Sequence, residues 1–167
     1  MRLALTLGYS GARMTLDMEL VREVEQLGYD SIWSAESYGS DAVTPVAWIA
    51  ALTTRVHVGT GIMQMAGRTP AATAMTAMTL DGLSGGRFRL GLGTGHRATM
   101  GGWHGQDIGN PVAEMREYVA LVRALLAGGE PPAGLRWNSS FAFNGFKPRA
   151  DIPIYLAGLS PAMLRLA

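Results

Sequence analysis

Four short apolar segments of this chain are each followed by a loop and then by a small polar residue with proline directly after it. The pairs are Thr44-Pro45, Thr69-Pro70, Asn110-Pro111 and Ser160-Pro161. A Thr, Asn or Ser side chain can accept a hydrogen bond from a free backbone N–H at a helix start, and proline at the first helical position loses no bond there. Each pair therefore predicts a helix N-terminus, and the repeat divides the chain into strand–helix units.

The apolar periodicity and the Gly and Pro positions predict where the elements lie. Strands are expected at residues 2–7, 31–35, 56–62, 88–93 and 154–157. Helices are expected from an N-cap at Thr15 to Gly28, with Leu16, Leu20, Val24 and Leu27 inward, at 45–53, 70–83 and 111–127, and from Pro161 onward. Residues 95–109 are expected to form a long loop and 130–152 an irregular insertion. Met63, Met65, Met75, Met78 and Trp48 are expected to pack in the core.

Strands that alternate with helices predict a parallel α/β sheet with right-handed crossovers. Two architectures fit, an open doubly wound sheet and part of a (β/α)8 TIM barrel. A whole barrel needs about 250 residues, so 167 residues would hold only its first four and a half units. The length predicts one domain over residues 1–167.

Composition excludes several kinds of function. The net charge of +1 gives no electrostatic basis for binding nucleic acid or an anionic membrane. The absence of cysteine excludes disulfides, thiolate catalysis and Cys-zinc sites, and three scattered His residues predict no metal site. Without an apolar run of about 18 residues or a signal-peptide pattern, a cytoplasmic protein is expected.

Ligands bind at the carboxyl ends of parallel strands in both architectures. The segments there are residues 8–11, 36–39, 61–64 followed by Arg68, and 93–97. Two of their side chains are candidate catalytic residues. His96 is suited to proton transfer, with an exposed loop histidine as the equal alternative. Glu36 is suited to act as a base or to hold a ligand hydroxyl, with a salt bridge to a neighbouring Arg as the alternative.

The glycines of the fourth strand predict a close approach of a ligand. Gly91, Gly93 and Gly95 resemble a dinucleotide fingerprint, but the third glycine is misplaced and about fifteen residues separate it from the next helix. Gly93, Thr94 and Gly95 are therefore interpreted as a glycine-lined approach for a flat ring, and not as a Rossmann motif.

Several motifs together resemble the bacterial luciferase-like monooxygenase superfamily, and the resemblance spans essentially the whole chain. The motifs are LGYDSIW at 27–33 followed by Glu36, VGTGIMQM at 58–65 followed by RTPA at 68–71, and TLDGLSGGRF at 79–88 followed by LGLG at 90–93. GWHG at 102–105 and DIPIYLA at 151–157 are similar to the branch that uses the deazaflavin coenzyme F420.

The resemblance implies a (β/α)8 barrel that binds a reduced flavin or deazaflavin at the strand ends and transfers a hydride or activates oxygen. It implies a non-prolyl cis peptide at Gly61-Ile62 behind the ring. In members of this family the second strand is often followed by an acidic residue and then histidine. Here the pair is Glu36-Ser37, and both residues are expected at the ring edge. His96 stands where sugar-phosphate members carry an acid. The backbone of Gly158, Leu159 and Ser160 is expected at the cofactor tail.

The leading hypothesis is hydride transfer between F420 and a small organic substrate, in a homodimer formed through the apolar faces of the second and third helices. The alternatives are an FMN-dependent monooxygenase, a non-catalytic half-barrel that only dimerises, and a doubly wound binding module. Family members continue through three more units, so a fragment is expected, with unpaired edges on the first and fifth strands. Leu3, Leu5, Ile154 and Leu156 would then face an incomplete core.

Overall fold

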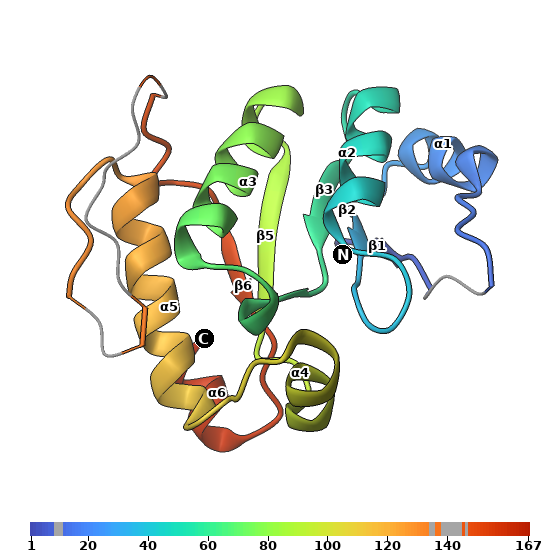
Figure 1. Cartoon of the computed structure of the whole chain (residues 1–167). Coiled ribbons are helices and arrows are strands. Elements are labelled where there is room, and N and C mark those ends of the chain that lie inside the picture. The colour runs from blue at the N-terminus through green and yellow to red at the C-terminus, as the bar shows by residue number, and fades with distance from the viewer. Residues whose placement is uncertain (9–11, 134–135, 138–144, 146) are drawn as a thin grey trace.

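The computed structural model describes residues 1–8, 12–133, 136–137, 145 and 147–167. All of its strands run parallel in one sheet (Figure 1). The strands are β1 (Ala4–Thr6), β2 (Ser31–Ser34), β3 (His57–Thr60), β4 (Met63–Gln64), β5 (Phe88–Gly93) and β6 (Ile154–Leu156). β1 pairs with β2, β2 with β3, and β5 pairs with β3, β4 and β6.

β3 lies within the strand expected at 56–62, which stops short of the cis peptide between Gly61 and Ile62. The chain resumes as β4 just beyond the expected end of that strand. Both strands pair with β5, so neighbouring strands follow chain order across the sheet. A doubly wound sheet reverses its order at a switch point. The observed order is that of the barrel alternative.

The helices lie at α1 (Met18–Gln26), α2 (Val43–Leu52), α3 (Pro70–Leu83), α4 (Arg97–His104), α5 (Pro111–Leu126) and α6 (Pro161–Leu166), with a 3-10 turn η1 at Met65–Gly67. Three of the four predicted N-caps are confirmed. Thr69, Asn110 and Ser160 each accept hydrogen bonds from backbone N–H groups of the first turn, and proline follows each of them. Polar–Pro pairs thus mark the starts of α3, α5 and α6.

Two predicted helix starts are wrong because a nearby aspartate caps the helix instead. α1 begins at Met18, where Asp17 accepts from the N–H groups of Glu19 and Leu20, and Thr15 lies outside the helix. α2 begins at Val43, before the Thr44-Pro45 pair, and the Asp41 carboxylate accepts from the first two N–H groups. A carboxylate at a helix N-terminus is also favoured by the helix dipole.

The loop expected at 95–109 is wrong in part, because α4 occupies its centre. The sequence did not predict this helix because it contains Gly101 and Gly102, and glycine is unfavourable in a helix interior. Gly105, at φ +63°, ends it with a left-handed residue. The insertion at 130–152 is partly outside the described residues, and its described part contains no helix or strand.

The inward faces of the helices differ from expectation at several positions. In α1 the buried residues are Val21 and Val24, whereas Leu20 and Leu27 are exposed. Trp48 of α2 and Met75 of α3 are also exposed, at 60% and 58%, and do not pack in the core. The physical reason is that α2 and α3 bury one face each against the sheet, through residues such as Ile49 and Ala77.

The core lies between the sheet and the helices α2, α3 and α5, which stand side by side over one face (Figure 1). The opposite face is concave. Trp33 of β2 meets Tyr155 of β6 edge to face at 5.2 Å between ring centroids, although β3 and β5 lie between these strands. Only a strongly curved sheet brings them together, as in a barrel wall.

Glycines under the Trp33 ring allow this curvature. A Cβ at Gly59 would lie 2.6 Å from the ring, and a Cβ at Gly91 would lie 1.8 Å from the carbonyl oxygen of Thr60. Thr60 joins the two strands there, because its hydroxyl donates to the carbonyl of Gly91 and accepts from the Gly91 N–H. Glycine is therefore required at both positions because any side chain would overlap a neighbouring group, and not because the backbone there needs to be flexible.

The sheet edges are as expected for an incomplete barrel. In the described residues β1 pairs only with β2, and β6 only with β5. Leu3 is exposed, and Leu5, Ile154 and Leu156 are half-buried. None of the described helices is long and apolar enough to span a membrane.

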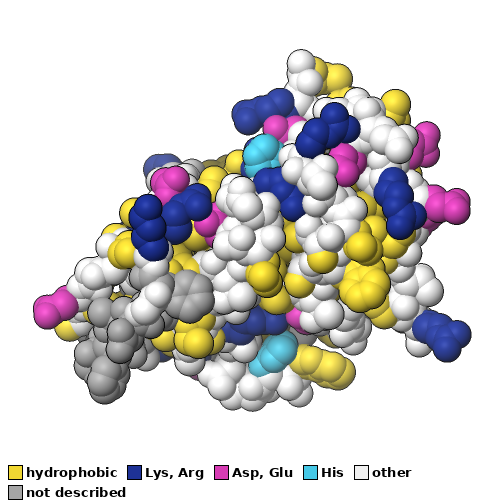
Figure 2. Space-filling view, turned by 90° about the horizontal axis from the view of Figure 1, so that it is seen from above, with side chains coloured by type: hydrophobic (Ala, Val, Ile, Leu, Met, Phe, Trp, Pro, Cys, Tyr) yellow, Lys and Arg dark blue, Asp and Glu magenta, His cyan; other side chains and the backbone are white. Residues whose placement is uncertain are grey.

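The end at which the strands begin is closed by charged networks. Arg87 donates to the hydroxyl of Thr53 and to the carbonyls of Ala50, Thr53 and Val56. Arg89 pairs with Asp30, and Arg149 with the buried Asp81. Figure 2 views this end and shows side chains of both signs intermixed. These pairs fix the chain where the strands start, which in barrels is the end associated with stability.

Tyr118 joins α5 to α3 and to the turn before it. Its hydroxyl lies 2.6 Å from the hydroxyl of Thr73 and donates to the backbone carbonyl of Arg68 at 2.9 Å. Burial raises the pKa of Tyr118 to about 12, against the smaller opposing effect of the Thr73 hydrogen bond. The phenol is therefore held neutral in the folded protein.

We expect Gly91→Ala to lower the free energy of unfolding by about 3 kcal/mol or more, because the new methyl group would overlap the Thr60 carbonyl. Gly82→Ala in α3 is the matched control. Its Cβ would meet nothing within 4 Å, so it should be neutral or stabilise by about 0.5–1 kcal/mol. Urea denaturation measures both. Equal effects of the two substitutions would contradict the close contact.

We expect Tyr118 to make unfolding depend on alkaline pH. The folded pKa of about 12 exceeds the ordinary value of 10.0, so this stabilisation is complete below pH 10 and is lost as pH rises toward 12. The slope should be about 1.4 kcal/mol per pH unit. Unfolding free energies of the wild type and Tyr118→Phe across this range measure it. A slope that persists in the variant would assign the effect to other groups.

Candidate functional site

The site is built at the end of the sheet where the strands finish. The peptide between Gly61 and Ile62 is cis, which confirms the predicted position. The Gly61 N–H donates to the Ser34 carbonyl at 2.6 Å, and the Ile62 carbonyl accepts from the Glu36 N–H at 3.3 Å. The bulge is therefore held from both sides by the end of β2.

The bulge reaches the surface while its surroundings are buried. Gly61 and Ile62 are half-buried, whereas Met63 and Gln64 beside them are buried. The Ile62 side chain lies against Gly93 of β5, where a Cβ would come within 2.7 Å of its terminal methyl. Gly93 is thus needed for the bulge to lie flat on the neighbouring strand.

Glu36 holds the chain that leaves the bulge. Its carboxylate accepts from the Gln64 N–H at 2.6 Å, from Arg68 at 2.8 and 2.9 Å, and from the Ala42 N–H at 3.2 Å. The salt bridge that the sequence left as an alternative is therefore present. These bonds connect the loop after β2 to the turn after β4.

Arg68 lies between two carboxylates. It pairs with Glu36 at 2.8 Å, and a second nitrogen lies 3.8 Å from Asp41. These three charged residues border a polar pocket of about 260 Å³ at the strand ends. Its other lining residues are Ser37, Gly39, Ser40, Gln64, Gly67, Trp103 and His104.

His96 lies at the start of α4, as its N-cap residue, and is exposed. It borders a second pocket of about 350 Å³ together with Tyr38, Ala98, Thr99, Gly102 and Trp103. Trp103 lines both pockets. The structure therefore brings the two predicted catalytic residues, Glu36 and His96, to neighbouring pockets that share one indole wall.

Three further predicted residues, Gly93, Thr94 and Gly95, form the link between β5 and α4. Thr94 donates to the Gly95 carbonyl at 3.2 Å. Gly95 has φ +74°, and a Cβ there would lie 2.8 Å from the sulfur of Met100. Glycine at this position is required both by its backbone and by the packing of α4.

Gly158, Leu159 and Ser160 follow β6, on the other side of β5 from the bulge. Ser160 caps α6 through the Met163 N–H, and Gly158 packs against the Met163 side chain. Leu159 is fully exposed. These residues thus lie at the same end of the sheet as the bulge.

Tyr38 and Thr99 were not identified from the sequence as site residues. Their hydroxyl groups lie 3.1 Å apart and join the loop after β2 to α4. The strand-end position of Tyr38 was a usable signal, but nothing marked Thr99, because its helix was expected to be a loop. Among the residues that the structure describes, no three His, Cys, Asp or Glu side chains come together as a metal site would require.

Comparisons with known proteins identify the family of this chain. A family model described as luciferase-like monooxygenase matches residues 3–167. A putative coenzyme F420-dependent oxidoreductase of Mycobacterium tuberculosis is 42% identical over 182 residues, which cover 100% of this chain and 52% of that protein. The 5,10-methylenetetrahydromethanopterin reductase of Methanolobus tindarius is 33% identical over 147 residues, covering 86% of this chain and 44% of that protein.

The fold is shared with solved structures. The coenzyme F420-dependent tetrahydromethanopterin reductase from Methanopyrus kandleri superposes with a TM-score of 0.81 at 24% identity, covering 99% of this chain and 52% of that one. The chain therefore spans about half the length of the relatives it matches. The family match over nearly all its residues and the parallel strands in chain order lead to one conclusion: this chain belongs to the luciferase-like monooxygenase family of enzymes and has a fold of the TIM-barrel type.

Proposed function

We propose that this chain is part of an oxidoreductase that transfers a hydride between coenzyme F420 and a small organic substrate. The observation that carries the proposal is the surface at the strand ends, where the half-buried backbone of Gly61 and Ile62 lies against Gly93 beside two pockets that share Trp103. The 42% identity to a putative F420-dependent oxidoreductase supports this choice of cofactor. Residues 1–167 would be the N-terminal part of one complete barrel domain.

The residues at the strand ends suit a flat, polar-edged ring. Backbone at Gly61 and Ile62 reaches the surface with little side chain above it, since Ile62 is turned onto Gly93. Gly93, Thr94 and Gly95 would border the ring, and Ser37 would supply a hydroxyl at its edge. The backbone of Gly158, Leu159 and Ser160 would hold the cofactor tail. F420, when bound, supplies the hydride.

The chain's own groups would position the reactants and move a proton. His96 is exposed beside the Tyr38–Trp103 pocket and would donate or accept the proton that accompanies hydride transfer. Glu36 would contribute through position, because its carboxylate fixes the Gln64 N–H and Arg68 next to the bulge. Trp103 and Tyr38 would exclude water from the substrate side.

Fluorescence titrations with F420 and with FMN separate this proposal from its alternatives. The family description includes monooxygenases, so selective FMN binding would favour an FMN-dependent monooxygenase. Binding of neither cofactor, with a size above the monomer in light scattering, would favour a half-barrel that only dimerises.

We also propose that the enzyme is a homodimer, supported by exposed Leu52 of α2 and exposed Leu83 of α3, and that it has a cytoplasmic location.

His96→Ala should lower turnover with F420 by about 100-fold while changing the F420 dissociation constant less than about twofold, because the imidazole moves a proton and does not hold the ring. His57→Gln is the matched control, since His57 lies at the start of β3 and bonds the Asp30 carbonyl. Turnover and fluorescence titration measure the two quantities. Weakened F420 binding with unchanged turnover would reject the proton role.

Glu36→Gln should lower the free energy of unfolding by about 2 kcal/mol, because a neutral amide cannot replace the carboxylate for Arg68 and the two N–H donors. F420 binding should weaken with it as the bulge loses its support. Glu130→Gln, at an exposed position, should change stability by less than about 0.5 kcal/mol. Urea denaturation and F420 titration measure both effects. Unchanged stability in Glu36→Gln would remove the positioning role.

A further inference from the structure

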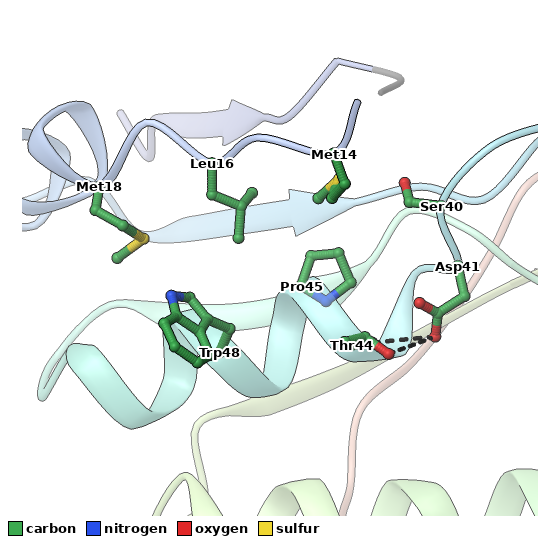
Figure 3. A pocket seen from close by; sticks show the side chains of 8 residues that line it. All are labelled: Met14, Leu16, Met18, Ser40, Asp41, Thr44, Pro45 and Trp48. Atoms are coloured by element: carbon green, nitrogen blue, oxygen red, sulfur yellow. Dashed lines mark hydrogen bonds between the residues drawn. The ribbon is translucent and has the colours of Figure 1, made fainter. Parts of the chain in front are cut away.

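A pocket of about 460 Å³ lies on the outer side of the sheet, between the segment that leads into α1 and the first turns of α2 (Figure 3). It shares Ser40 and Asp41 with the polar pocket at the strand ends, and its lining does not include the bulge. Its lining residues are Met14, Leu16, Met18, Ser40, Asp41, Thr44, Pro45 and Trp48. Its volume is in the range of small-molecule sites, which are mostly apolar with a few fixed polar groups.

The long walls of this pocket are apolar. Figure 3 shows Met14, Leu16 and Met18 pointing down from one side toward Pro45 and Trp48 on α2. The Trp48 side chain is 60% exposed although the sequence predicts it in the core. Thioether and indole groups are polarisable and adapt to varied apolar shapes. The walls therefore suit an aromatic or aliphatic body.

One end of the pocket is polar and acidic. One carboxylate oxygen of Asp41, Oδ2, accepts from the N–H and the hydroxyl of Thr44 (Figure 3). The same oxygen also accepts from the N–H of Val43. These bonds fix the carboxylate in place at the start of α2. Its side chain keeps 39% of its surface exposed. The pocket thus has an anionic group at one end that is already held in place, so the Asp41 side chain need not move for a ligand to reach it.

The charge of Asp41 is only partly balanced. Among the ion pairs of the described residues its partner is Arg68, at 3.8 Å, and Arg68 makes its shorter pair with Glu36 at 2.8 Å. Two carboxylates thus share one guanidinium, which leaves one negative charge on the group. A ligand with a positive charge at one end would complete the balance.

We propose that this pocket binds a small amphiphilic primary amine. Its ammonium group would pair with Asp41, and its apolar body would lie between the methionine side chains and the Trp48 indole. An ammonium carries three donors, which matches the remaining acceptor capacity of the carboxylate and the Thr44 hydroxyl. The site uses neither the cis bulge nor His96, so it does not depend on the proposed redox function.

The test uses three molecules of matched shape: 2-phenylethylamine, its neutral counterpart 2-phenylethanol and its anionic counterpart 3-phenylpropanoate. Each is titrated into the purified 167-residue chain while the indole N–H resonances are followed by NMR, with Trp48→Phe used to assign the Trp48 signal. We expect the amine to shift the Trp48 resonance saturably, with an affinity about two- to fivefold above that of the alcohol, as a partly exposed ion pair provides. The anion should bind more weakly still.

Two variants locate the binding. Asp41→Asn should reduce amine affinity to that of the alcohol, since asparagine still caps a helix but carries no charge. Asp107→Asn, at an exposed position, is the matched control and should leave it unchanged. Met14→Ala removes an exposed wall of the same pocket and leaves the Trp48 signal in place. It should weaken binding of amine and alcohol alike, which keeps the test decisive if Asp41→Asn fails to fold.

Equal affinity for the three molecules, or shifts at Trp33 or Trp103 in place of Trp48, would overturn the proposal. So would a Trp48 resonance that moves on dilution of the protein and not on addition of the amine, because a second copy of the chain would then occupy the pocket. Amine binding that Asp107→Asn weakens as much as Asp41→Asn would show general charge attraction and would also overturn it.

Discussion

The contact of the Trp33 ring with the glycines of the next two strands is the constraint on which the rest of the structure depends. Because Gly59 and Gly91 have no side chains, the indole can lie across β3 and approach β5, and its edge meets Tyr155 on β6. This requires a curved sheet, and the curvature turns the ends of the strands toward a common point. The candidate site lies at that point.

The bulge at Gly61-Ile62 is held by the same strands. Thr60 bonds Gly91 through its hydroxyl, Ile62 turns onto Gly93, and β4 then resumes the pairing with β5. Glu36 and Arg68 fix the chain on the far side of the bulge. Backbone bonds and one carboxylate with several donors therefore support the surface that we assign to the cofactor. His96, to which we assign the proton, is exposed at the start of α4.

The two ends of the sheet differ in how their polar groups are used. Where the strands begin, Arg87 donates to several backbone carbonyls, and Asp30 and Asp81 each pair with an arginine. Where the strands finish, Tyr38, His96 and Trp103 are exposed around the pockets. The same asymmetry separates stability from function in barrels, and the outer pocket at Asp41 adds a third region whose charge is not balanced.

The sequence by itself determined the parallel strand–helix order, three of the four polar–Pro helix starts and the position of the cis peptide, because local capping and a family motif specify them. It also placed Glu36 and His96 at the strand ends. Only the tertiary structure decided that Asp17 and Asp41 begin the first two helices, that residues 97–104 are helical, and that Trp48 is exposed. The aspartate caps are local, two or three residues from the N–H groups that they accept from, but several nearby polar residues could have capped each helix and the pattern does not rank them. The exposure of Trp48 depends on which helix face finds a packing partner, and that partner is distant in the chain.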